Sequence, residues 1–230
     1  MHAQYYPIFL ALDKRVCLVV GGGPVGERKI RTLLQYGAAI RLIAEDPTPW
    51  LKVQCDKGTI LLVGRTYSKS FLKEVDLVFA ATSDLALNRA IAVDAERQRL
   101  WCNMAAEPEL GSFLVPSIFR RGPLSIAIST GGASPTVAVR IKEKLEHEFG
   151  AEWTILLGLM ALLRKTIQSK GLESVQNQEI YRKVSELPLL EWIQNREETQ
   201  TIQAISDICH PWIDLTELKR IWNEAWKQFS

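Results

Sequence analysis

A cluster of glycines is the strongest chemical signal in the sequence. Gly21, Gly23 and Gly26 are spaced as G-x-G-x-x-G directly after the apolar run VCLVV. In such a turn the first glycine permits a tight bend, the second lets the backbone approach a pyrophosphate, and the third lets a helix pack closely on a strand. A helix that begins near Pro24 and Val25 also points free amides and the positive end of its dipole at an anion. The pattern predicts that these five residues bind a dinucleotide, the alternative being a glycine turn with a structural role only.

Acidic and small residues follow two other apolar runs. Glu45 and Asp46 come after RLIA, at the distance where nucleotide-binding folds place an acid on the adenosine ribose. An acid there repels a 2′-phosphate, so the pattern favours NAD over NADP, unless these are only solvated turn residues before Pro47. Ala81 and Thr82 follow LVFA, where the carboxyl ends of parallel strands border a cofactor crevice. Small side chains at these two positions would admit the nicotinamide ribose.

The first half of the chain alternates short β-branched runs with amphipathic runs, as in a parallel sheet with crossover helices. We expect strands at residues 15–20, 39–43, 59–63, 76–81 and 100–104. Helices are expected to fill the gaps between them, notably at 26–36 and 88–99. The strands are almost continuously apolar, which is typical of a sheet buried on both faces. The sequence therefore predicts a Rossmann-type, doubly wound parallel α/β domain over residues 1–112.

Two further segments are expected after this domain. Residues 113–150 hold two apolar runs separated by Arg-Arg-Gly-Pro, and then a glycine-rich loop that leads into a helix capped by Ser134. Apolar residues every four positions, from Val137 to Phe149, predict one apolar face for that helix, whose other face carries Arg140 and Lys144. Residues 151–230 show no strand pattern and hold five of the seven tryptophans, which we interpret as core or subunit interface. We expect a small α+β segment followed by a helical C-terminal domain.

Composition and charge exclude several classes of protein. The 230 residues are 47% hydrophobic and carry a net charge of +2, which describes a globular chain and gives no global attraction to nucleic acid or a membrane surface. The longest apolar run, residues 155–163, is shorter than the roughly 20 residues that cross a bilayer. The amino terminus does not resemble a signal peptide, so a cytoplasmic protein is expected. The four cysteines form no CxxC pair and favour buried thiols in a reducing compartment.

Five segments, in this order and spacing, resemble the precorrin-2 dehydrogenase family, the dehydrogenase and ferrochelatase part of sirohaem synthases and their stand-alone relatives. They are PIFLAL, VVGGGPVGERK, LVFAATSD, CNMAAEPELGSFLVPS and GPLSIAISTGGASPTVAVRIKEKLE. The resemblance implies a homodimer of Rossmann domains, with residues 113–150 as the dimerisation segment. It also implies NAD-dependent oxidation of precorrin-2 to sirohydrochlorin, followed in bifunctional members by insertion of Fe²⁺ to give sirohaem. The family's NAD contacts fall on Pro24 with Val25 and on Glu45 with Asp46.

Precorrin-2 is rich in carboxylates, so its pocket needs cations and amide donors. The candidates are the arginines and the residues of a glycine loop whose backbone can form an anion nest: Arg28, Arg120, Arg121, Arg140, Thr130, Gly131 and Ser134. The alternative for each arginine is an ordinary solvated side chain. No metal-ligand cluster is apparent, so Fe²⁺ is expected only as a substrate.

One position departs from the family. Its members carry an aspartate two residues before the loop proline, assigned to both dehydrogenation and chelation as a base that removes a pyrrole proton. Here that position is Ala106. Glu107 supplies the carboxylate if the loop is turned by one residue, whereas Glu109 is a poorer candidate; a solvated loop glutamate is the alternative reading of Glu107. Two hypotheses follow: a precorrin-2 dehydrogenase with or without ferrochelatase activity, and a chelatase only or a non-catalytic NAD(H)- or tetrapyrrole-binding protein. The substrate-side motifs disfavour a third, an NAD-dependent enzyme for a small anionic substrate.

Overall fold

The protein is described here by a computed structural model, which places residues 5–229. The chain divides into two compact units, the first ending at Val115 and the second beginning at Pro116. Each unit has hydrophobic clusters of its own. Among residues 5–229, no helix combines the length and the apolar character that a bilayer span requires.

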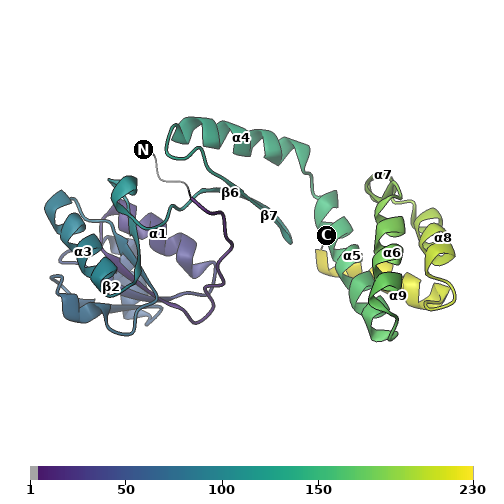
Figure 1. Cartoon of the computed structure of the whole chain (residues 1–230), viewed down its shortest axis with the longest axis horizontal. Coiled ribbons are helices and arrows are strands. Elements are labelled where there is room, and N and C mark those ends of the chain that lie inside the picture. The colour runs from purple at the N-terminus through teal and green to yellow at the C-terminus, as the bar shows by residue number, and fades with distance from the viewer. Residues whose placement is uncertain (1–4, 230) are drawn as a thin grey trace. The chain divides into compact units, whose positions relative to one another are not determined.

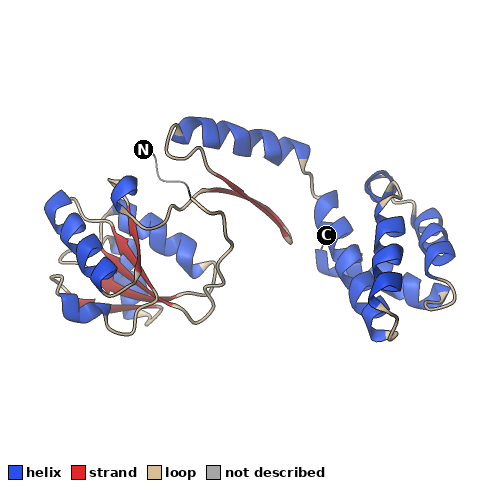
Figure 2. Ribbon diagram, in the orientation of Figure 1, coloured by secondary structure: helices blue, strands red, loops and turns tan. Residues whose placement is uncertain are grey.

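The first unit is a parallel five-stranded sheet with helices on both faces (Figure 2). Its elements are β1 (Val16–Val20), α1 (Pro24–Leu34), β2 (Ala39–Ile43), α2 (Pro49–Asp56), β3 (Ile60–Gly64), the 3₁₀ turn η1 (Lys69–Leu72), β4 (Leu77–Ala80), α3 (Leu85–Arg97), β5 (Trp101–Met104) and the 3₁₀ turn η2 (Pro108–Leu110). The strand order is β3-β2-β1-β4-β5, so the order reverses at β1, which pairs with both β2 and β4. This is the Rossmann arrangement, in which ligands bind beyond the carboxyl ends of the strands at the reversal.

Both faces of the sheet are buried because successive side chains of each strand point to opposite sides. In β1, Cys17 and Val19 pack in the cluster that contains residues of α1 and α2, whereas Leu18 and Val20 pack in the cluster that contains residues of α3. All four side chains are almost completely buried. The continuous apolar run is thus explained by two covered faces, and the expected doubly wound fold is confirmed.

The bounds of several elements differ from the expectation. Helix α1 begins at Pro24 rather than residue 26, and α3 begins at Leu85 rather than 88. Helix α2 lies in a gap between two expected strands, where a helix was expected without bounds, because it buries only Leu51 and so has little apolar periodicity. Its start could have been read from Thr48, whose side chain accepts the amide of Leu51, followed by Pro49 at the first helical position.

A carboxylate joins the opposite, amino-terminal ends of two neighbouring strands. Asp76 accepts hydrogen bonds from the amide of Val16 at 2.8 Å and from the guanidinium of Arg15 at 2.9 Å. These hydrogen bonds, the backbone one foremost, hold the pKa of Asp76 below its ordinary value. The interaction ties β1 to the start of β4.

The second unit begins with a hairpin and a helix. Strands β6 (Ser117–Arg121) and β7 (Leu124–Ile128) are antiparallel, and α4 (Pro135–Glu148) lies beside them (Figure 1). Their small core is formed by Phe119, Ile128 and Ala138. The guanidinium of Arg121 donates to the carbonyls of Phe149 at 3.0 Å and Glu146 at 3.2 Å, so it caps the carboxyl end of α4.

The apolar face expected for α4 is covered only in its second half. Leu145 and Phe149 pack against the small core, whereas Val137 and Ile141 are 46% and 38% exposed. Val139 is also exposed. In a single chain the hairpin therefore covers the second half of this apolar face and leaves Val137 and Ile141 exposed.

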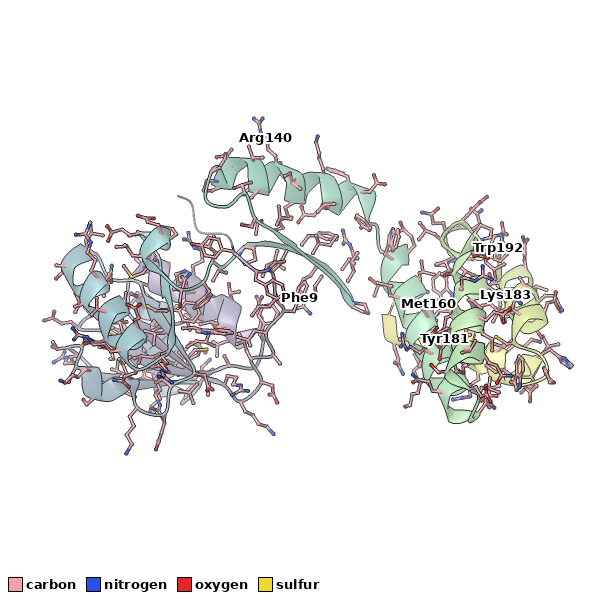
Figure 3. All side chains as sticks on the ribbon, viewed as in Figure 1. Phe9, Arg140, Met160, Tyr181, Lys183 and Trp192 are labelled. Carbon is pink, nitrogen blue, oxygen red and sulfur yellow. The ribbon has the colours of Figure 1, made fainter. Side chains whose placement is uncertain are left out.

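The rest of the second unit is helical, as expected. Its helices are α5 (Glu152–Ser169), α6 (Ser174–Ser185), α7 (Leu189–Gln194), α8 (Glu198–Cys209) and α9 (Leu215–Phe229). Their common core includes the buried Trp222, with Met160, Tyr181 and Trp192 partly buried against it (Figure 3). Most of the tryptophans of this region therefore serve as core residues, which confirms the structural interpretation of the aromatic pattern.

Candidate dinucleotide-binding site

The glycine turn joins β1 to α1 at the carboxyl edge of the sheet, and its glycines differ in what surrounds them. Gly21 has φ +119°, and a Cβ there would lie 2.3 Å from the carbonyl oxygen of Ala81. A Cβ on Gly26 would lie 2.0 Å from the carbonyl oxygen of Gly21. A Cβ on Gly23 would meet no atom within 4 Å. Packing therefore explains two of the three glycines, and the space beside Gly23 is open.

The amino end of α1 faces this open space without a side-chain cap. Gly23 is the N-cap residue, Pro24 has no amide hydrogen, and the first amide with a backbone partner is that of Glu27, which donates to the Gly23 carbonyl. The amides of Val25 and Gly26 precede it and have no acceptor within the helix. An anion placed beside Gly23 can accept from these amides and from the helix dipole.

A second network holds the turn against the loop after β2. The amide of Thr48 donates to the Gly22 carbonyl at 3.0 Å, and the Thr48 hydroxyl donates to the carboxylate of Glu27. The hydrogen bonds from Thr48 and Arg31 lower the pKa of Glu27. Gly22 also has no room for a side chain, since a Cβ would lie 2.6 Å from that of Ala44. The glycine spacing alone did not reveal this network.

Glu45 and Asp46 lie in the same loop, and both are exposed. The ammonium of Lys52 donates a hydrogen bond of 2.7 Å to the carboxylate of Asp46. This hydrogen bond and the charge of Lys52 lower the pKa of Asp46. No such partner is assigned to Glu45. The adjacent ends of β1 and β2, where Val20 pairs with Ile43, place this loop next to the glycine turn.

Thr82, at the end of β4, is fixed by a buried asparagine. Asn88 in α3 is fully buried, accepts from the amide and the hydroxyl of Thr82, and donates to its carbonyl at 3.0 Å. Ala81 is buried next to Gly21. Thr82 and Ala81 thus lie beside the glycine turn, as the sequence predicts, and Asn88 is a positioning residue that the sequence analysis did not select.

The loop after β5 lies at the same edge. The amide of Ala105 donates to the carbonyl of Ala80 at 3.1 Å, and Ala106 and Glu107 follow. The carboxylate of Glu107 is held by three hydrogen bonds from Arg89: Nε donates to Oε2 at 2.9 Å and to Oε1 at 3.2 Å, and Nη2 donates to Oε1. This hydrogen-bonded ion pair lowers the pKa of Glu107.

A half-buried lysine, Lys29, is hydrogen-bonded to Asn103 in β5, and Asn103 is hydrogen-bonded to Phe113, which follows the loop. Lys29 in α1 donates to the side-chain oxygen of Asn103 at 2.6 Å, and the Asn103 amide donates to the carbonyl of Phe113 at 3.0 Å. Burial, and then the neighbouring charge of Arg28, lower the pKa of Lys29. Asn103 is itself 3% exposed, so its two hydrogen bonds satisfy a buried amide.

The candidate carboxylate-binding residues are divided between the two units. Arg28 is exposed in the first unit, and Arg120, Arg140 and the loop 129–134 belong to the second. Arg140 projects away from α4 (Figure 3). Gly131 and Gly132 have φ of +63° and +87°, and a Cβ on either would meet nothing within 4 Å. Arg121 is engaged at the end of α4 and is therefore not a free cation.

The residues of the first unit fit a dinucleotide. In this fold the pyrophosphate is held by an open approach such as that at Gly23 and by acceptor-free amides such as those in the first turn of α1. The ribose is held by an acidic loop such as the one after β2. Among residues 5–229, no group of three or more histidine, cysteine, aspartate or glutamate side chains is arranged to hold a metal ion.

Two family models match the chain. Residues 8–117 match a family of NAD(P)-binding domains. Residues 121–148 match the central region of sirohaem biosynthesis proteins. The two matches lie in the order in which the resembling segments occur in the sequence.

Much of the chain is similar to siroheme synthases. The siroheme synthase 2 of Yersinia enterocolitica is 34% identical over 206 residues, which are 89% of this chain and 44% of that protein. The siroheme synthase 2 of Klebsiella pneumoniae is 43% identical over 143 residues, 62% of this chain and 31% of that protein. The chain thus spans less than half the length of these relatives.

A solved structure extends the similarity to almost the whole chain. The protein described as "SirC, precorrin-2 dehydrogenase" is 27% identical, with a TM-score of 0.71, and the match covers 97% of this chain and 100% of that one. The helical region after residue 150 therefore belongs to the shared fold. The expected resemblance is confirmed, and the chain belongs to the family formed by the NAD(P)-binding and central regions of sirohaem synthases and their stand-alone relatives.

Proposed function

We propose that this chain catalyses the NAD-dependent oxidation of precorrin-2 to sirohydrochlorin. The observation that carries the proposal is the glycine turn with its open position at Gly23, in a chain whose fold matches a precorrin-2 dehydrogenase over 97% of its length. The reaction removes one hydride and one proton from precorrin-2 and yields NADH. NAD supplies the hydride acceptor.

The chain's residues have distinct parts in this proposal. Gly21, Gly23, Pro24, Val25 and Gly26 form the pyrophosphate site; Glu45 and Asp46 bind the adenosine ribose; Ala81 and Thr82 border the nicotinamide ribose. Asn88 orients the Thr82 loop through its three hydrogen bonds to that residue. Glu107 is the candidate base for the pyrrole proton.

The carboxylates of precorrin-2 require cationic and amide partners. We assign this part to Arg28, Arg120, Arg140 and the loop residues Thr130, Gly131 and Ser134. The positive φ angles of Gly131 and Gly132 and the exposed backbone of the loop support an anion nest there.

The proposal includes a homodimer in which residues 113–150 form the shared segment. The exposed Val137 and Ile141, which share one face of α4, support it, because apolar side chains on one helix face are costly to leave in water. In this scheme residues 1–112 bind the cofactor and residues 151–230 form a separate helical domain. The four free cysteines support a reducing, cytoplasmic location.

An anaerobic assay with enzymatically prepared precorrin-2 and NAD tests the proposal. NADH formation at 340 nm and the sirohydrochlorin spectrum are followed in the same cuvette, and equal yields of the two products are expected. Fluorescence titration with NADH is run alongside. A protein that binds NADH and yet forms no sirohydrochlorin would refute the dehydrogenase proposal.

A second candidate is a chelatase only, or a non-catalytic NAD(H)- or tetrapyrrole-binding protein. Ala106 favours it, because alanine cannot accept a proton, and so does the ion pair that lowers the pKa of Glu107 and weakens it as a base. Adding Fe²⁺ to ready-made sirohydrochlorin tests the chelatase: sirohaem formation above the rate without protein supports it, and the same rate excludes it.

A further inference from the structure

We propose that Arg89 is a positioning residue for the oxidation, holding the Glu107 carboxylate at the carboxyl edge of the sheet. The inference rests on the proposed function and adds a residue to its site. It is carried by the geometry of three elements: the loop after β4, the loop after β5 and the first turns of α3.

Glu107 does not behave as a solvated loop residue. Its side chain is only 17% exposed, although it stands in a loop between β5 and a 3₁₀ turn. The loop begins with the hydrogen bond from the amide of Ala105 to the carbonyl of Ala80, the last residue of β4, and Glu107 follows two residues after Ala105. A carboxylate that is largely shielded from water needs hydrogen bonds from the protein to replace those it made to water.

Arg89 supplies that partner with a defined geometry. Its Nε donates to Oε2 of Glu107 at 2.9 Å, and its Nη2 donates to Oε1. Such a two-point contact between planar groups fixes direction as well as distance, which a lysine cannot do. Glu109 is the other acid that acts on the Arg89 charge.

The same turn of α3 also fixes the cofactor side of the site. Asn88, the residue before Arg89, makes three hydrogen bonds to Thr82. Two consecutive residues therefore tie two loops of the carboxyl edge to one rigid helix. Sites held by residues on helices keep their geometry better than sites on loops alone.

This arrangement gives a physical meaning to Ala106. The loop has lost the carboxylate at that position, while the neighbouring position carries a longer acid that an arginine orients. The ion pair keeps Glu107 ionised at neutral pH, because it lowers the pKa of that carboxyl. Orientation by Arg89 then compensates for reduced basicity.

Chemical rescue separates positioning from simple loop stabilisation. Glu107→Ala removes the carboxylate and leaves Arg89 facing a vacated space that formate can occupy. We expect kcat for precorrin-2 oxidation to fall about 100-fold in this variant. Added formate is then expected to raise the kcat of the variant about 10-fold. In the double variant Arg89→Met with Glu107→Ala, formate is expected to restore nothing, since no guanidinium binds it.

Single variants at Arg89 complete the test. Arg89→Met is expected to lower kcat about 10-fold, by loss of orientation, with little change in KM, and Arg89→Lys to recover part of the loss. Arg97→Met is the matched control: Arg97 lies on the same helix, is 76% exposed and pairs with Asp94 in its own helix. It should leave kcat unchanged.

Several results would overturn the inference. The positioning role of Arg89 is refuted if formate raises kcat equally in Glu107→Ala and in the double variant that also lacks Arg89. It is also refuted if Arg89→Met has the kcat of the wild type. A raised KM with unchanged kcat makes Arg89 a substrate-binding residue instead. These outcomes require an active wild-type protein; a wild type that binds NADH without turnover refutes the proposed function itself, and the positioning role falls with it.

Discussion

The open space beside Gly23 leads to a prediction that separates cofactor binding from folding. The substitutions compared are Gly23→Ala and Gly26→Ala, which add the same methyl group to the same turn. At Gly23 the methyl meets no protein atom within 4 Å and the backbone φ is −79°, which alanine adopts without strain. At Gly26 it would lie 2.0 Å from the Gly21 carbonyl oxygen, and real Cβ contacts do not fall below 3.0 Å.

These distances set the expected magnitudes. Gly26→Ala must move α1 away from the turn by about 1 Å, and such overpacking costs about 1–3 kcal/mol. The higher helix propensity of alanine returns about 1 kcal/mol. Because the obstructing atom is backbone and cannot rotate away, we expect a net loss of about 2 kcal/mol and a Tm lower by about 4–8 °C.

Gly23→Ala is expected to change the free energy of unfolding by only about 0.5 kcal/mol, as alanine is a poorer N-cap than glycine. Its methyl group occupies the space through which the pyrophosphate reaches the amides of α1. Loss of one hydrogen bond to a charged group costs about 1.5–3 kcal/mol, so the affinity for NADH should fall about 10- to 100-fold.

The assay pairs thermal unfolding with fluorescence titration of NADH for the wild type and both variants. We expect Gly23→Ala to be stable but to bind NADH about 10- to 100-fold more weakly, and Gly26→Ala to be destabilised. This expectation is refuted if Gly23→Ala binds NADH as tightly as the wild type, or if it loses as much stability as Gly26→Ala.

Three other properties follow from the structure. Hydrogen bonds lower the pKa of Asp76, so the stability that its carboxylate contributes is present above the ordinary aspartate pKa and is lost as the pH falls through the lowered value. At pH 7, Asp76→Asn should therefore unfold at a lower urea concentration than the wild type. The difference between the two proteins should vanish in acid. Arg121→Met should cost about 1 kcal/mol by uncapping α4 and speed amide exchange at the end of that helix, whereas Arg140→Met on its exposed side should not. In the native protein Ellman's reagent should modify Cys55 first, because the other three thiols are buried and burial raises their pKa to about 11 or above; simultaneous reaction of all four would contradict the described core.

Much of the first unit could be predicted from local sequence. A run such as VCLVV, followed by glycines at fixed spacing, predicts a strand, a turn and a helix because each signal acts over a few residues. Strand β2 was placed at its observed bounds, residues 39–43. The bounds of helix α2 could not be predicted because its few turns bury a single leucine, so the apolar periodicity that marks a helix is nearly absent.

The partners of the site residues could not be predicted in this way. Arg89 and Glu107 are far apart in the chain, and nothing in either neighbourhood specifies the ion pair that joins them. The same holds for Asn88, a polar residue in a helical run whose full burial is set by the loop that it binds.

The sequence by itself determined the kind of elements and the chemistry of the glycine turn, since backbone conformation and close approach depend on the residue at one position. Only the tertiary structure decided that packing does not require a glycine at position 23, and that Glu107 is the loop acid that pairs with Arg89. Such facts depend on distances between segments that the chain brings together when the sheet forms. For that reason Gly23 and Gly26, alike in the motif, have different parts in the folded protein.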